Sequence, residues 1–509
     1  MSKQASWNLG SCGARGIARI GALLALTFVA AGVAQAQQSP SGGTPSGGTP
    51  SGGGDAITWK GITLYGVVDI GAQYQTHGVP TSDYFQSGTE TVIQKNSQGS
   101  VTAVTSSNLQ QSRIGVTGNE PLIGDWAGVF RLEMVFNPAS GNISDALKSQ
   151  VLNNGRPITQ QTTNVDSSYA GEFFGGAAYL GLASAKVGSF TFGRHVTTLA
   201  DGIAKYDPMS ASLAFSLIGF SGTPAGGGDT EDRRLDNSLK YSGKYGPVHT
   251  GALYQFSNSS GSQNSAFQAS LGFDYAGFSI DGYYAKKYNA FATSPLSAAQ
   301  VQDLQNGQCE TPPVTVPPTP KRCWSPSNSL AATISDNKSY AAMALYDMGT
   351  LKFYGGYERI TFDNPNTETT PGSLTIGGYV LAFTNNAAYG CAPGKTTDCP
   401  GQRVLQVYWG GVKWTVTPPF DIVVAGYGLH QNSFAAGANA GCNSRASNGC
   451  SGTEEVYSIL GDYRLSKRFD VYLGTMYSAV HDGLASPAPP NGFFNTNTLT
   501  TTAGIRFKF

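Results

Sequence analysis

The amino-acid sequence predicts an all-β fold, an antiparallel transmembrane β-barrel of about 16 strands with an inward-folded third loop. Three observations support this: strand-like segments alternate apolar and polar residues, short turns alternate with long connections, and only 13% of the 509 residues are charged. Soluble globular domains have about 25% charged residues. The 66 Gly, 25 Tyr and 25 Phe residues suit strands flanked by aromatic girdles. The zero net charge gives no reason to expect a nucleic-acid partner.

The N-terminal residues 1–36 have the pattern of a secretory signal peptide. Arg15 and Arg19 precede an apolar run at 20–31, and a small-residue cleavage site ends at Ala36. The competing interpretation, a transmembrane anchor, would need about 18–20 apolar residues. Residues 37–60 follow as a flexible segment rich in Gly, Ser and Pro, which contains the sequence Ser-Gly-Gly-Thr-Pro twice. The barrel is expected at 61–509, with ordered structure beginning near Gly61.

The first strand-like segments show which face each side chain should take. In 62–72, Leu64, Val68 and Ile70 share one face, and Asp69 takes the other. In 126–136 four apolar side chains form one face, and Arg131 and Glu133 lie opposite. In the dry core of a soluble sandwich such charges would be unpaired, whereas in a wide barrel they line water.

Short and long connections alternate along the whole chain. Short turns are expected near 121–125, 185–188, 243–247, 275–277, 347–349, 417–420 and 465–468. Longer connections are expected near 76–108, 138–175, 196–233, 257–265, 291–337, 363–401, 433–452 and 481–497. Seven short turns and eight longer loops give about sixteen strands, with both ends of the barrel on the short-turn side. An even strand number with short turns on one side is typical of bacterial outer-membrane barrels.

The last strand has a regular alternating end. Ile505, Phe507 and Phe509 should point outward, and Arg506 and Lys508 inward. The C-terminal strand ending in Phe509 is expected to be the assembly signal that the outer-membrane assembly machinery recognises.

Six cysteines of the exported chain fall in three close pairs between strand patterns. The pairs are Cys309 with Cys323, Cys391 with Cys399, and Cys442 with Cys450. In an exported chain such cysteines are read as disulfides, and pairing within each loop is the simplest of the fifteen possible connectivities. Zinc is the rival interpretation, but no CxxC pair occurs and His is scarce.

Five segments of the chain resemble the general (non-specific) porins of Gram-negative outer membranes, of the beta-proteobacterial type. The segments that carry the resemblance are Thr63–Asp69, Ser112–Gly118, Val187–Arg194, Val404–Trp409 and the terminal Phe509. The resemblance covers the chain from about Ile62 to its end. It implies a homotrimer embedded in outer-membrane lipid, in which the third outer loop forms a constriction opposite an arginine cluster on the wall.

Arg113 and Arg234 match two of the wall arginines that the resemblance implies. Val67 stands where some family members carry a lysine, and Gly175-Gly176-Ala177 stands where another wall arginine is common. The sign of the charge preference therefore cannot be taken over from the family.

Strand parity adds further candidates for the pore wall. Arg113, Arg131 and Glu133 should face inward, either as a fixed field across the constriction or as a structural ion pair. Arg234 and Lys240 share a parity and can face the bore or stand at its mouth. Arg194 has the parity of the outward Phe190 and Phe192, which suggests an anchor for the loop root or a subunit contact.

The expected constriction loop, about 196–233, carries the acidic candidates. Asp201 and Asp207 lie early in it and are the best acidic pore candidates, although ordinary loop solvation explains them equally well. A loop of this length between strands is usually functional or disordered.

The predicted function is passive diffusion of small hydrophilic solutes and ions, with no enzyme activity, cofactor or metal. One alternative is a substrate-selective channel for sugars or aromatic acids, in which Tyr206, Phe215 and Phe220 form an apolar ladder. Another is a barrel enzyme or adhesin. The five histidines are scattered and no GxSxG motif is present, which argues against catalysis.

Overall fold

The strands keep the period-two pattern that the sequence shows. In β22 (Asn497–Lys508), Ile505 and Phe507 are exposed, whereas Arg506 between them pairs with Asp470 at 2.7 Å. Side chains alternate across a strand because its backbone is pleated. The alternation therefore sorts this strand into an apolar exposed face and a charged opposite face.

The structure is a computed structural model. It describes residues 57–77, 99–139, 141, 143, 173–219, 234–257, 265–295, 309–310, 322–323, 330–363, 375–376, 379–383, 403–434, 441–443, 450–484 and 496–509. All of these belong to one compact unit, Pro40–Phe509. The expected signal peptide, Phe220, Cys391 and Cys399 lie outside the described residues.

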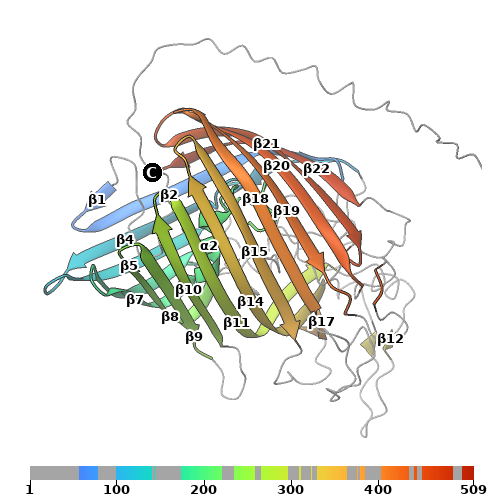
Figure 1. Cartoon of the computed structure of the whole chain (residues 1–509), viewed down its shortest axis with the longest axis horizontal. Helices are drawn as coiled ribbons and strands as arrows, with labels where there is room; N and C mark the ends of the chain where they lie inside the picture. Colours follow the sequence, from blue (N-terminus) through green and yellow to red (C-terminus); the bar gives the residue numbers. More distant parts are fainter. Residues whose placement is uncertain are drawn as a thin grey trace, which may run out of the picture. The chain divides into compact units, whose positions relative to one another are not determined.

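Sixteen of the described strands form a closed antiparallel ring (Figure 1). The ring consists, in order, of β2 (Ile62–Gln75), β4 (Arg113–Pro121), β5 (Trp126–Val135), β6 (Ala177–Ser184), β7 (Gly188–Val196), β8 (Arg234–Tyr245), β9 (Val248–Gln255), β10 (Ala266–Tyr275), β11 (Phe278–Pro295), β14 (Leu330–Asp347), β15 (Leu351–Asp363), β18 (Arg403–Thr417), β19 (Phe420–Gln431), β20 (Gly452–Arg464), β21 (Phe469–Asp482) and β22. Pairing of β2 with β22 closes the ring, and Ile70 lies opposite Ile505 in that register. The predicted sixteen-stranded antiparallel barrel is confirmed.

The connections alternate as the sequence predicts. The seven short ones are 122–125, 185–187, 246–247, 276–277, 348–350, 418–419 and 465–468. Each of the eight other gaps between ring strands is longer and falls where a long connection was expected.

Additional strands occur inside the long connections, where the sequence analysis expected none. β3 (Val101–Ser106) pairs with the second half of β2, beyond the residues that pair with β4. The two strands therefore act as one broken partner of β2, interrupted at 107–112, where Ser107 has a φ of 62°. The long connection expected at 76–108 is present between β2 and β4, and it contains this short strand, which the sequence analysis did not predict.

Other short strands also extend the sheet. β1 (Ile57–Trp59) pairs with the start of β2, ahead of Gly61, where ordered structure was expected to begin. β16 (Thr375–Ile376) pairs with β17 (Tyr379–Phe383), and β17 lies parallel to β14.

Glycine and aromatic residues are paired across strands, which explains why both are abundant. Phe130 lies opposite Gly118, Tyr408 opposite Gly428, and Trp409 opposite Gly356. A Cβ added to any of these three glycines would lie between 2.1 and 2.2 Å from the partner ring. Each ring therefore occupies the space above its glycine, an arrangement known to stabilise such pairs.

One predicted disulfide falls on described side chains. Cys442 and Cys450 are bonded, with their Cα atoms 4.9 Å apart, within the connection between β19 and β20. The backbones of Cys309 and Cys323 are direct partners across β12 (Cys309–Glu310) and β13 (Arg322–Cys323). This pair and Cys391 with Cys399 stay predictions as disulfides.

Within the described part of the chain, no helix is long and apolar enough to cross a membrane.

The closing pair of strands contains a close approach that a substitution can test. Gly71 on β2 and Gly504 on β22 are direct partners, and a Cβ on Gly71 would lie 2.3 Å from the carbonyl oxygen of Ala503. We expect Gly71→Ala to destabilise the folded barrel by about 1–3 kcal/mol, because overpacked backbone must move. Urea unfolding in detergent, followed by the heat-dependent gel shift of the folded barrel, measures this.

Gly410→Ala is the matched control for Gly71→Ala. Gly410 also has a glycine partner, Gly355, but its added Cβ would have an ordinary 3.6 Å contact with the oxygen of Tyr354. Equal unfolding midpoints for the two variants would contradict the close-approach argument.

Candidate pore-lining site

A group of charged side chains surrounds Glu133 on β2, β4 and β5. Its Oε2 atom lies 2.5 Å from Nη2 of Arg131 and 3.4 Å from Nε of Arg113. The hydroxyl of Tyr65 donates to the same oxygen at 2.9 Å, and Nε of Arg131 donates to the Tyr65 oxygen at 2.7 Å. The structure thus brings together Arg113, Arg131 and Glu133, as strand parity indicates. We call these residues with Tyr65 the wall cluster.

The exposure of the wall cluster is unequal. The side chains of Arg113 and Arg131 are each 23% exposed, whereas that of Glu133 is 1% exposed. The two cations therefore cover the anion, and the accessible surface of the cluster is positive.

Arg234 interacts electrostatically with this cluster and donates hydrogen bonds to backbone and amide groups. Its Nε donates to the oxygen of Gly176 at 2.6 Å, and its Nη2 donates to Oε1 of Gln111 at 3.1 Å. A Cβ on Gly176 would lie 2.4 Å from Oε1 of Glu133. Gly176 therefore stands where the wall has no room for another side chain. The buried Arg234 joins β8 to the segments just before β6 and β4.

The segment after β7 begins with a short helix, α2 (Thr198–Tyr206). The Thr197 hydroxyl accepts from the amide of Ala200 at 3.1 Å, which caps the helix. Asp201 lies in the first turn, where the helix dipole favours a negative charge. Its Oδ2 pairs with Nζ of Lys240 at 2.5 Å. The structure thus joins the predicted residues Asp201 and Lys240.

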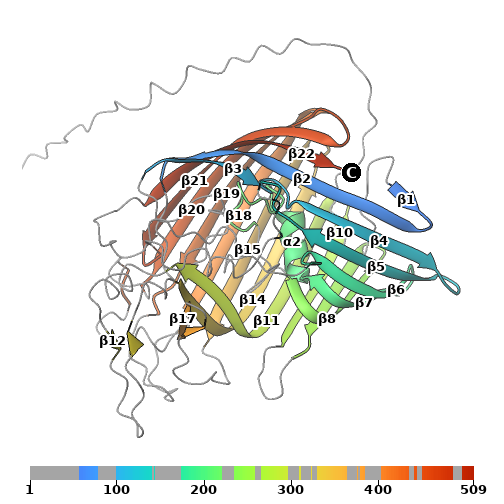
Figure 2. The same cartoon turned by 180° about the vertical axis from the view of Figure 1, so that it is seen from behind.

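The far end of α2 is attached to β10 and β11. Lys205 Nζ lies 3.4 Å from Asp274 and 3.6 Å from Asp281, and His249 Nε2 lies 2.7 Å from Asp281. The hydroxyl of Tyr206 is within 2.6 Å of Oγ of Ser279 and also donates to Asp281. Burial, together with the bond to Asp281, raises the pKa of Tyr206. Figure 2 shows α2 beside these strands.

Asp207, which follows α2, is fully buried rather than presented to solute. Its carboxylate accepts hydrogen bonds from the amides of Met209 at 3.1 Å and Ala211 at 2.7 Å, and from the hydroxyl of Tyr427 at 2.5 Å. Burial raises the pKa of Asp207, and the bond from Tyr427 opposes that rise. Asp207 therefore stabilises the turn and is left out of the charges available to a solute.

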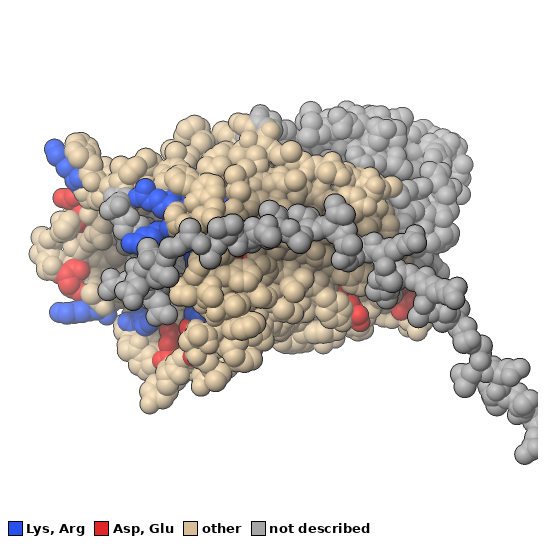
Figure 3. Space-filling view, turned by 90° about the horizontal axis from the view of Figure 1, so that it is seen from above, with Lys and Arg blue, Asp and Glu red and all other residues tan. Residues whose placement is uncertain are grey.

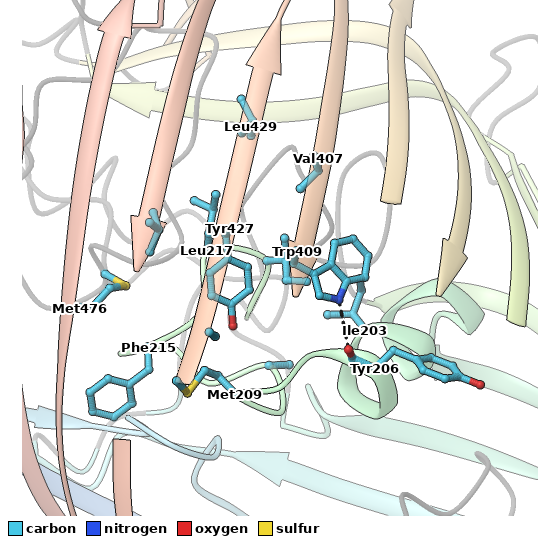
Figure 4. Close-up of a cluster of buried hydrophobic side chains, with 14 of the residues drawn as sticks. Ile203, Tyr206, Met209, Phe215, Leu217, Val407, Trp409, Tyr427, Leu429 and Met476 are labelled. Atoms are coloured by element: carbon cyan, nitrogen blue, oxygen red, sulfur yellow. Dashed lines mark hydrogen bonds between the residues drawn. The ribbon is translucent and has the colours of Figure 1, made fainter. Parts of the chain in front are cut away.

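The residues around Asp207 form an apolar contact with strands far along the sequence. Trp409 Nε1 donates to the oxygen of Tyr206 at 3.1 Å (Figure 4). A Cβ added to Gly474 would lie 2.6 Å from the ring of Phe215. The same cluster of buried side chains contains Leu217, Tyr427 and Met476. At its other edge the amide of Ala214 donates to the oxygen of Asn108 at 3.0 Å. Residues 197–219 are thus fixed to several strands of the ring.

Sequence reasoning missed several of these residues. Tyr65 has the same strand parity as Asp69, so parity could have found it. No sequence signal marks Trp409 as a contact of Tyr206 or Tyr427 as a contact of Asp207, because each pair is about two hundred residues apart. The sequence left Arg194 open as an anchor of the loop root or a subunit contact. Its side chain is buried, and its Nε donates to the oxygen of Gly175 at 2.9 Å. Its role as an anchor stays a prediction.

Among the described residues, no group of three or more His, Cys, Asp or Glu side chains could hold a metal ion.

The ring and its charged opposite face define a class of protein. A closed barrel with an exposed apolar face and buried charges on the other is a transmembrane β-barrel with a polar interior. The family model described as Gram-negative porin matches residues 22–482, so the chain belongs to the Gram-negative porin family. The protein is therefore located in the outer membrane and functions as a porin. The beta-proteobacterial type stays a prediction.

Solved structures confirm the fold. An anion-selective porin from Comamonas acidovorans is 14% identical with a TM-score of 0.52, and the match covers 88% of this chain and 99% of that one. Outer-membrane expressed OmpT of Vibrio cholerae is 11% identical with a TM-score of 0.50, and the match covers 89% and 100% of the two chains. Comparison with curated protein sequences finds no match.

Removal of the Asp207 side chain tests whether this residue is structural. We expect Asp207→Ala to destabilise the barrel by about 1–3 kcal/mol, because the buried Tyr427 hydroxyl and two amides lose their acceptor. The ion selectivity should stay close to wild type, since the carboxylate is not accessible. Urea unfolding and the reversal potential in a salt gradient measure the two quantities.

Tyr427→Phe is the control, since it removes one of these hydrogen bonds and keeps the aromatic ring. Its effect on stability should be the smaller of the two. A large change in selectivity for Asp207→Ala with unchanged stability would show instead that Asp207 acts on the solute.

Proposed function

We propose that the protein mediates passive diffusion of small hydrophilic solutes and ions through a water-filled, charge-lined channel. The observation that carries this is the closed ring of sixteen strands with charged side chains on the face opposite its apolar surface. Polar residues that face the interior of a wide barrel are stable only where they meet water or partners. Neither a cofactor nor an energy source is part of this proposal.

The third long loop, about 196–233, folds into the bore in this proposal and narrows it. The support lies in the contacts of its described part, 197–219. Tyr206, Phe215 and Leu217 pack against buried side chains of β18–β21, which lie on the face opposite the exposed apolar residues. Fixed at several strands, such a segment limits the size of a passing solute.

In this proposal, charges on opposite sides of the narrow region create an electric field across it. The positive surface of the wall cluster stands on one side. Asp201 stands on α2, where its side chain is 33% exposed while its partner Lys240 is 4% exposed. Fixed charges of this kind bias which ions enter a narrow pore. Arg113, Arg131 and Asp201 are therefore the proposed selectivity residues, and Glu133, Arg234 and Lys240 hold them in position.

A homotrimer is the proposed assembly. Strands β4–β7 are among the short strands of the ring, and β6 and β7 expose Leu180, Leu182 and Phe192. These apolar side chains suit either lipid or a second subunit. The C-terminal strand is proposed to carry the assembly signal at Phe509.

The alternative of a substrate-selective channel has less support. Tyr206 and Phe215 are fully buried and pack against the wall, so they present no aromatic ladder to a solute. Saturable, solute-specific block of the current would favour this alternative over simple diffusion. Family and fold indicate a channel, and hydrolytic activity without conductance would favour the barrel-enzyme alternative instead.

Two substitutions in the wall cluster should shift selectivity in opposite directions. Arg113→Ala removes an accessible positive charge, so the anion-to-cation permeability ratio should fall by about twofold. Glu133→Gln keeps an acceptor for Tyr65 but removes the anion that neutralises Arg113 and Arg131, so these two accessible cations become unpaired and the ratio should rise by a similar factor. Reversal potentials of the purified protein in a planar bilayer under a salt gradient measure both.

The heat-dependent gel shift checks that both variants fold before they are compared. Shifts of the same sign in the two variants, or no shift in either, would contradict the proposed role of the wall cluster. Absence of ion conductance by the folded wild-type protein would overturn the proposed function as a whole.

A further inference from the structure

A second group of charged side chains lies at the short-turn ends of β18–β22, apart from the wall cluster. Asp421 Oδ2 lies 2.8 Å from Nζ of Lys413 and 2.6 Å from Nη1 of Arg464. Asp470 Oδ2 lies 2.7 Å from Nη2 of Arg506 and 2.9 Å from Nζ of Lys508. Each aspartate is thus bridged by two cations.

These side chains occupy the face of the sheet opposite the exposed apolar residues. Trp414, Tyr463 and Phe507 alternate with Lys413, Arg464 and Lys508 along their strands, and all three aromatic residues are exposed. The short turns 418–419 and 465–468 follow within a few residues. In bacterial outer-membrane barrels the short turns are periplasmic, so this group stands at the periplasmic mouth of the bore. Figure 3 shows charged side chains gathered at one end of the described surface.

Asp421 and Asp470 are less exposed than the cations that pair with them. The Asp421 and Asp470 side chains are 2% and 1% exposed, whereas those of Arg464 and Lys508 are 35% and 39% exposed. A third carboxylate, Asp462, lies 3.1 Å from Arg506 and is 16% exposed, against 14% for that arginine. Four cations and three carboxylates leave the group with one excess positive charge, and its two most exposed members, Arg464 and Lys508, are cations.

The ammonium groups of Lys413 and Lys508 have more N–H donors than their ion pairs use. Lys413 and Lys508 each make one ion pair among the contacts described here. An ammonium group has three N–H donors. Two donors of each lysine are therefore available to an anion in the bore.

The group continues the wall cluster around the barrel. Lys508 and Arg113 are both register partners of Val67, one on each side of β2. Neighbouring strands are about 4.8 Å apart, so the two cations lie roughly two strand spacings from each other. The positive surface thus extends from β5 past β2 to β18.

We infer that Lys413, Arg464, Arg506 and Lys508 form an anion-binding site at the periplasmic mouth, in addition to the wall cluster. This site binds small anions such as chloride and inorganic phosphate. The inference rests on the proposed channel function and adds to it a group of cations next to the wall cluster, on strands β18–β22. Fixed positive charge at one mouth raises the local anion concentration there. Because the charge is on one side only, the current–voltage relation should be asymmetric.

Salt concentration gives this asymmetry a distinctive signature. The Debye length is about 30 Å at 0.01 M salt and about 3 Å at 1 M. The wild-type channel should therefore rectify at low salt and lose its rectification at high salt. A loss of pore width alone would not depend on salt in this way.

The test is the double variant Lys413→Gln and Lys508→Gln in the full-length protein. Asp421 keeps its pair with Arg464 and Asp470 keeps its pair with Arg506, so no buried carboxylate loses all its partners. We expect the low-salt rectification to fall by about half or more and the chloride-to-potassium permeability ratio to fall by about twofold. Block of the chloride current by inorganic phosphate added at one side should weaken in parallel.

Lys286→Gln with Lys338→Gln is the matched control. These two lysines are register partners on β11 and β14 and contact the rings of Tyr288 and Tyr340 at 4.3 and 5.9 Å. They share strand parity with the exposed Ile280 and Tyr340, so the control removes two positive charges without touching the bore. It should behave as wild type.

The outcomes separate the inference from the function on which it rests. A wild-type channel that conducts but does not rectify at low salt overturns the proposed anion-binding site. Equal behaviour of the test and control variants overturns it too. Lack of conductance in the wild-type protein overturns the proposed function itself. If the double variant folds poorly, Lys508→Gln alone should show a smaller reduction of the same kind, and its absence overturns the inference.

Discussion

Closure of the sheet between β2 and β22 is the constraint on which the other features depend. In hydrocarbon every backbone N–H and C=O group must find a partner, so a spanning sheet can have no free edge. Phe509 takes part, because its amide donates to the oxygen of Gly66 at 3.1 Å and its carbonyl oxygen accepts from the amide of Gly66 at 2.9 Å. Once the ring is closed, every strand has one face toward lipid and one toward the bore. Strand parity then decides where each charge must lie.

The same closure explains why so many ion pairs occur together. Residues such as Asp69, Glu133 and Asp470 are held on the interior face and cannot reach bulk solvent by turning around. Asp69 shows the consequence: it accepts from the amides of Leu109 and Gln110, each at 2.8 Å, and from the hydroxyl of Tyr472 at 2.5 Å. Its partners come from the break between β3 and β4 and from β21. An acid inside the barrel thus links segments that are distant in sequence.

The sequence predicts the ring well because its signals are local. Turn residues and alternation mark every ring strand, and parity correctly joins Arg113, Arg131 and Glu133. The sequence does not predict the features that depend on tertiary contacts. β3 is a strand of six residues that pairs with β2. α2 is a single short helix held by Lys240 and Asp281. Asp207 looks like a loop acid in the sequence, but Tyr427 covers it from a strand far along the chain.

The sequence also cannot show which charged side chains are buried. The chain has 32 basic and 32 acidic residues, so its composition favours neither ion. The structure breaks this balance by depth, since Glu133, Asp421 and Asp470 lie beneath the cations that pair with them. A buried anion orients its cationic partners and at the same time is hidden from the solute. The sign that an ion encounters along the wall therefore follows from which partner of each pair is outermost, and for Glu133, Asp421 and Asp470 that partner is a lysine or an arginine.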